Sequence, residues 1–74
     1  MSVPAGRPVL TSTSGIKGII EEGDRLLIAF FKHDGYFHVP LTDRGICAQI
    51  RQAYQNREIV SFHFDAELRV LSVS

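Results

Sequence analysis

Residues 25–41 read RLLIAFFKHDGYFHVPL, and this stretch decides the fold class. Residues 25–32 are apolar on both faces and predict a strand that lacks the alternation of a half-solvated one. The dipeptide Asp34-Gly35 is typical of a tight hairpin turn, so residues 36–41 are expected to return as the next strand. Pro40 has no N–H to donate, which predicts either the end of that strand or a sheet edge. The stretch therefore predicts an antiparallel hairpin.

A further strand is predicted just before this hairpin. Residues 15–22 read GIKGIIEE, a β-branched run that ends at the turn residues Gly23-Asp24. Gly18 lies in its middle and predicts a bulge or a sharp bend, because glycine weakens a straight strand.

Residues 1–14, MSVPAGRPVLTSTS, are expected to form a flexible leader whose last residues the sheet holds. They lack the positive and apolar regions of a secretory signal, which favours a cytoplasmic protein over a secreted one and leaves the compartment unassigned.

Helical periodicity follows the hairpin. Ile46, Ile50, Ala53 and Tyr54 fall on one face of a helix. Thr42 or Asp43 is the expected N-cap, and Asn56 is expected to take the left-handed conformation at the other end.

Two more strands are predicted after the helix. Residues 59–65 alternate, with Val60, Phe62 and Phe64 on one face. Asp65-Ala66-Glu67 turns the chain, and residues 68–73 form the last strand. The order strand, strand, strand, helix, strand, strand predicts a single α+β domain over residues 15–74. We expect a five-stranded antiparallel, OB-like, partly open barrel with its helix between the third and fourth strands. A flat sheet crossed by one helix is the alternative.

Three segments carry a family resemblance. LLIAFFKHDGYFHVPL, ICAQIRQAYQNREIV and SFHFDAELRVLSV resemble the OB-fold binding subunits of bacterial AB-type toxins and related small bacterial proteins of uncharacterised function. The resemblance implies a ring-forming module that recognises a glycan or a partner protein. The sequence departs from that pattern in two ways, since Cys47 has no partner for a disulfide and tryptophan is absent. No glycan-binding residue is carried over.

Composition narrows the classes of function. Eight basic and eight acidic side chains leave the 74-residue chain with no formal net charge. This balance argues against binding to nucleic acid or to anionic membranes, both of which draw on surplus positive charge. No apolar run approaches the roughly 20 residues of a membrane-spanning helix.

The residues that could carry chemistry favour structural roles. His33, His38 and His63 lack the close spacing of zinc ligands, and exposed turn and strand positions are expected for them. Cys47 adjoins the apolar stripe of the helix, which favours a buried structural cysteine over a nucleophile. No catalytic, metal-binding or cofactor-binding residue is assigned, and we expect the protein not to be an enzyme.

The hairpin aromatics supply the candidate surface. Neighbouring residues of a strand face opposite sides, so one member of each pair Phe30-Phe31 and Tyr36-Phe37 must lie outside the core. Contact with another subunit or partner is the preferred explanation, ahead of coverage by the leader and of base stacking in a single-stranded nucleic-acid binder. We therefore expect a non-catalytic binding module, homo-oligomeric through the outer face of the second or last strand. Its candidate interface or ligand surface consists of Ala29, Phe31, Lys32, Tyr36, Phe37 and His38.

Overall fold

The longest strand, β1 (Leu10–Glu22), organises the sheet. In the computed structural model, which describes residues 8–74, residues 10–15 pair with β4 (Ile59–Phe64) and residues 16–22 pair with β2 (Arg25–Phe30), both antiparallel. The first strand therefore begins at Leu10 instead of residue 15. Residues 10–14 of the predicted leader belong to β1, held by the sheet, and residues 1–7 lie outside the described part.

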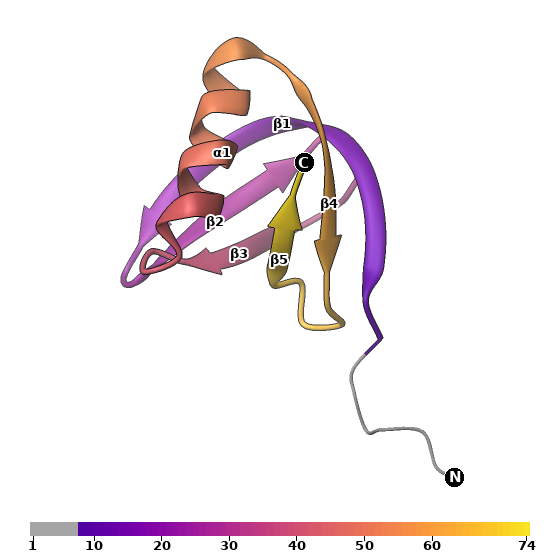
Figure 1. Ribbon diagram of the computed structural model, residues 1–74, viewed down its shortest axis with the longest axis horizontal. Coiled ribbons are helices and arrows are strands. Elements are labelled where there is room, and N and C mark those ends of the chain that lie inside the picture. The colour runs from indigo at the N-terminus through magenta and orange to yellow at the C-terminus, as the bar shows by residue number, and fades with distance from the viewer. Residues whose placement is uncertain (1–7) are drawn as a thin grey trace, which may run out of the picture.

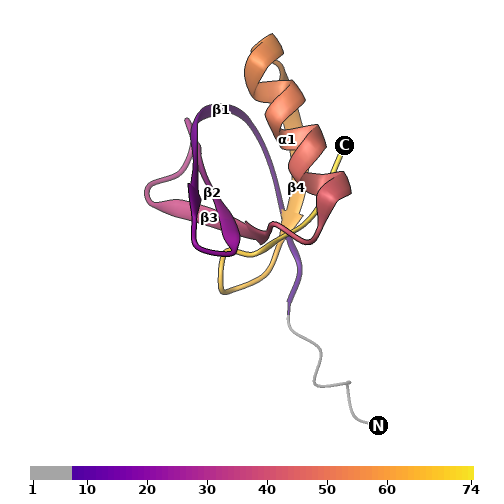
Figure 2. The same ribbon diagram turned by 90° about the vertical axis from the view of Figure 1, so that its left-hand side faces the viewer.

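The two halves of β1 meet at a bulge. The register with β2 shifts between Ile16 and Gly18, where the sequence predicted an irregularity. The strand curves strongly and arches over the molecule (Figures 1 and 2). Because of this curvature, one strand reaches two partners that lie on different sides of the core.

The predicted hairpin is present, with a longer loop than expected. β2 is followed by β3 (Tyr36–Pro40), and Gly23 and Gly35 take positive φ angles of 63° and 79° in the turns before and after β2. β2 ends at Phe30 instead of residue 32, because the N–H groups of the next two residues do not pair with β3. Phe31 donates to the Gly15 carbonyl oxygen at 3.1 Å and Lys32 donates to Ser14 Oγ at 3.2 Å.

The helix α1 (Arg44–Asn56) begins after Asp43, whose side chain accepts a hydrogen bond from the Ile46 N–H. It ends one residue later than expected. Arg57, and not Asn56, takes the left-handed conformation, with φ 55° and ψ 43°. The buried positions of the helix are Cys47, Ile50 and Ala53.

The last strand, β5 (Val70–Val73), is shorter than the predicted residues 68–73. The turn that precedes it continues to Leu68 because the buried Asp65 carboxylate accepts from two N–H groups, those of Glu67 at 2.9 Å and Arg69 at 3.0 Å.

The five strands form one sheet in the order β3-β2-β1-β4-β5, and every ladder is antiparallel. The two edge strands approach each other without forming a continuous ladder. They share a single parallel bridge between His38 and Arg69, in which the His38 N–H donates to the Leu68 carbonyl oxygen at 3.0 Å. The α+β class is confirmed, and the sheet is not closed.

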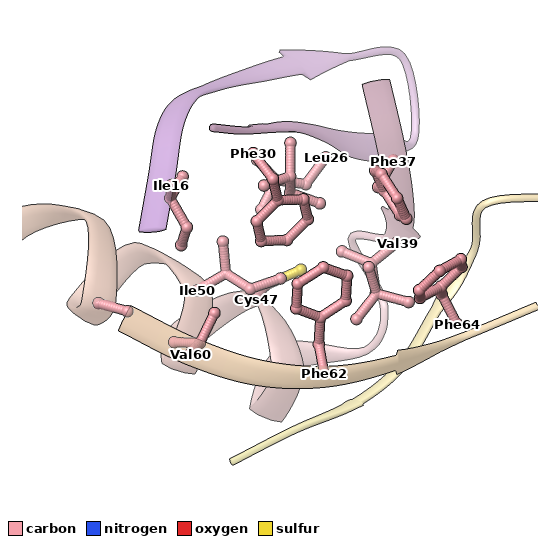
Figure 3. Packing of buried hydrophobic residues seen from close by; sticks show 13 residues of the cluster. Ile16, Leu26, Phe30, Phe37, Val39, Cys47, Ile50, Val60, Phe62 and Phe64 are labelled. Atoms are coloured by element: carbon pink, nitrogen blue, oxygen red, sulfur yellow. The ribbon is translucent and has the colours of Figure 1, made fainter. Parts of the chain in front are cut away.

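Aromatic side chains fill the core between the two halves of the sheet (Figure 3). Phe30 from β2 stacks on Phe62 from β4 with ring centroids 4.0 Å apart and planes 10° apart. Phe37 and Phe64 meet edge to face at 4.9 Å. Val60, Phe62 and Phe64 are all buried, so the predicted inward face of β4 is confirmed.

Candidate functional site

The sheet leaves an apolar surface on the side of β1, β2 and β3 that faces away from the core. Leu27 pairs with Ile20 on one side and with His38 on the other, and Ala29 pairs with Tyr36 in the next row. We call these five residues the outer face. Strand pairing thus brings together three of the predicted surface residues, Ala29, Tyr36 and His38.

The two apolar faces of β2 differ in their exposure to solvent. Leu26, Ile28 and Phe30 are buried, whereas Leu27 and Ala29 are only half-buried. Across the neighbouring strands the large side chains of Ile20 and Tyr36 are 48% and 49% exposed. The outer face is therefore open in the monomer.

Each aromatic pair of the hairpin divides as predicted. Phe30 and Phe37 are in the core at 1% exposure, and Phe31 and Tyr36 face outward at 69% and 49%. Phe37 is consequently a core residue and does not belong to the candidate surface. Lys32 is exposed and follows Phe31 in the loop after β2.

The histidines have structural partners. Nε2 of His38 donates to the Glu67 carbonyl oxygen at 3.0 Å, and Nδ1 of His63 lies 2.9 Å from Ser72 Oγ. His33 and His38 were expected to be exposed and are half-buried. The ring of His33 packs against that of Phe37, with centroids 5.1 Å apart, and its Nε2 lies 2.8 Å from Ser12 Oγ. Across residues 8–74, no three His, Cys, Asp or Glu side chains gather as metal ligands would.

Cys47 is buried, as predicted. Its side chain is 6% exposed, and the thiol points toward the Pro40 carbonyl oxygen at 3.5 Å. Burial raises the pKa of the thiol, and the positive charge of Arg51 offsets only part of that effect. A protonated, covered thiol is a poor nucleophile.

A groove lies between the end of α1 and the arch of β1, with a volume of about 510 Å³. Phe31 belongs to its wall, and the sequence analysis had assigned none of the other lining residues to a site. The lining consists of Gly15, Ile16, Lys17, Phe31, Tyr54, Gln55, Arg57 and Glu58.

Tyr54 illustrates why the sequence pattern did not predict the groove. Its helical spacing placed it on the apolar stripe, yet the side chain is 40% exposed, and the buried face of the helix is formed by Cys47, Ile50 and Ala53. An amphipathic residue in the last turn of a helix is a weak signal that fits both a core edge and a surface site.

Comparison with known proteins places the chain in no family, since no family model, no curated protein and no solved structure matches it. No helix within residues 8–74 is both long and apolar enough to span a membrane.

Proposed function

We propose that the protein is a non-catalytic interaction module, built on an OB-like, partly open barrel, that assembles through the outer face into a homo-oligomer. The strand order, the helix between β3 and β4, and the parallel bridge between the edge strands support the barrel architecture.

The observation that carries the proposal is the apolar outer face. Ile20, Leu27, Ala29 and Tyr36 come from three adjacent strands and share one surface. Soluble monomers rarely expose contiguous apolar patches larger than a few hundred Å², and such patches are typical of interfaces. Removing apolar surface from water contributes about 25 cal/mol per Å², which matters for a domain with a small core.

A second copy of the chain is the proposed occupant of this face. The formal net charge of zero means that two copies carry no overall repulsion. The charged side chains at the end of these strands are already satisfied within the chain, because Arg25 and Glu22 form an ion pair at 3.6 Å. Between this ion pair and the hairpin loop, the outer face carries the side chains of Ile20, Leu27, Ala29 and Tyr36 together with the His38 imidazole, and none of the five is an acid, a lysine or an arginine.

Sedimentation of the purified chain over the micromolar range tests this proposal. We expect reversible association that Tyr36→Lys weakens at least tenfold, because an ammonium group would be buried in the interface. Ile59→Lys is the matched control, since Ile59 is 71% exposed on β4, pairs with Gly15 of β1 and contacts neither β2 nor β3 in the ladder, so its replacement should leave association unchanged. A wild-type monomer over the whole range would refute the oligomer.

Recognition of a glycan or a partner protein is the proposed role of the assembled module, supported by the family resemblance. A glycan array probed with the assembled wild-type protein tests the first of these ligands. The alternative, an extended single-stranded nucleic acid, is disfavoured by charge. Its phosphate contacts would come from Lys32, Arg25 and Arg51, and two of these three cations, Arg25 and Arg51, already pair with Glu22 and Glu21.

A further inference from the structure

We infer that the groove between the end of α1 and the arch of β1 binds a flat aromatic ring that carries one anionic group, the chemistry of a nucleoside monophosphate. This site is separate from the outer face and does not depend on oligomer formation.

Phe31 gives the groove an exposed ring in a defined position. Its side chain is 69% exposed although its backbone is fixed by the hydrogen bond to Gly15. The ring lies close to the backbone of β1 at Gly15. A Cβ added to this glycine would be only 3.3 Å from Phe31 Cδ2. A solvent-facing aromatic ring provides a stacking surface for a flat ligand.

Tyr54 adds a second aromatic side chain to the same groove, from the last turn of α1. Phe31 lies in the loop after β2 and Tyr54 lies in α1, and both residues belong to the lining. A flat aromatic ligand suits such a lining because aromatic side chains make favourable contacts with other rings in stacked and in edge-to-face arrangements.

The charge of the groove selects an anion. Lys17 and Arg57 line it, and neither forms an ion pair within residues 8–74, whereas Arg25 and Arg51 do. Glu58 is the single acidic residue of the lining, so one positive charge is left over. A guanidinium group donates two parallel hydrogen bonds to a phosphate or carboxylate.

The size of the groove limits the ligand. A volume of about 510 Å³ is within the range of small-molecule sites, roughly 300–1,000 Å³. The site therefore fits one ring system with one anionic group. A long nucleic acid would need further cations, which the neutral chain does not supply in excess.

Titration of the isotope-labelled full chain with adenosine monophosphate, followed by amide NMR, tests the inference. We expect saturable shifts of Gly15, Phe31 and Arg57, with adenosine alone and inorganic phosphate alone each binding at least tenfold more weakly. Shifts confined to other residues, or none, would overturn it. An oligothymidine should bind no more tightly per site than the mononucleotide. Tighter binding, with a salt dependence that indicates several phosphate contacts, would refute the pocket and indicate a surface that binds the phosphate backbone.

Two variants separate binding from folding. Phe31→Ala should weaken binding about 5- to 150-fold, as expected for loss of a stacking ring. Arg57→Gly should also weaken binding, while its resistance to urea stays equal or rises, because glycine takes the left-handed conformation at φ 55° without strain. Loss of affinity without loss of stability cannot come from misfolding. Unchanged affinity in either variant would overturn the inference.

Arg44→Ala is the matched charge control. Arg44 is exposed in the first turn of α1, at the opposite end of the helix, and its removal should leave binding unchanged. An equal loss in this variant would show a nonspecific charge effect and refute the site. Tyr36→Lys, which disrupts the proposed oligomer, should still bind the mononucleotide, so the two proposals can fail separately.

Discussion

At the scale of single residues, Cys47 connects burial with chemistry. The thiol lies under the helix against the Pro40 carbonyl, and burial raises its pKa because the thiolate loses hydration. The unfolded chain exposes the same thiol to water, where it ionises near its ordinary pKa of about 8.5. Ionisation is therefore easier in the unfolded state than in the folded state.

The sign of this difference predicts the effect of alkaline pH. The protonated thiol favours the folded state, so the free energy of unfolding should fall as pH rises above about 8.5. Urea titrations at several alkaline pH values measure this slope. Cys47→Ala should lack this contribution and show a shallower decline, and an identical slope in both proteins would contradict the assignment.

At the scale of elements, the turn between β4 and β5 positions the edge of the sheet. The Asp65 carboxylate accepts from the N–H groups of Glu67 and Arg69, and the Asp65 N–H donates to the Arg69 carbonyl at 3.1 Å. Leu68, held in this turn with φ 67°, offers its carbonyl to His38 of β3. The turn thereby links the two edge strands.

Loss of this carboxylate should destabilise the protein. We expect Asp65→Ala to lower the free energy of unfolding by about 1.5–3 kcal/mol, the usual range for hydrogen bonds to a charged group. Urea unfolding monitored by circular dichroism measures the loss. The exposed Asp34 in the hairpin loop offers a comparison, since Asp34→Ala should change stability by less than about 0.5 kcal/mol. Equal effects of the two substitutions would argue against a special role for the turn.

At the scale of the whole molecule, one aromatic cluster joins the two halves of the sheet. Phe62 of β4 stacks on Phe30 of β2 and meets Phe37 of β3 at 5.5 Å (Figure 3). These strands are not neighbours of β4 in the sheet, because β1 lies between β2 and β4. Side-chain packing therefore holds β4 against β2 and β3, with which it forms no ladder of its own.

The cluster should decide whether the chain folds. Domains of 74 residues have a total stability on the order of 4–11 kcal/mol, and Phe→Ala in a core costs about 3–5 kcal/mol. We expect Phe62→Ala to be largely or partly unfolded at room temperature by circular dichroism, whereas Phe62→Leu remains folded. An alanine variant as stable as the leucine variant would contradict the central role of this ring.

Local chemistry predicted most elements and their order. Gly18 marked the bulge, Pro40 the end of β3, and Asp43 the start of the helix, because each of these effects depends on a residue and its near neighbours. The boundaries that were wrong depend on distant partners. Residues 31 and 32 are not part of β2, because their N–H groups donate hydrogen bonds to Gly15 and Ser14.

The candidate site was predicted only in part. Alternation required that one of Tyr36 and Phe37 face outward, but it could not say which, and burial by β4 decided for Phe37. The groove was not predicted because Gly15, Phe31, Tyr54 and Arg57 are far apart in the chain.

The amino-acid sequence alone determined the strand and helix segments, the α+β class and the two apolar faces of β2, since these follow from local periodicity and turn chemistry. Only the tertiary structure decided which face is buried, how β1 bends to serve two partners, and which side chains meet at the groove. The physical reason is that burial and contact depend on the packing of distant segments, which no local pattern encodes.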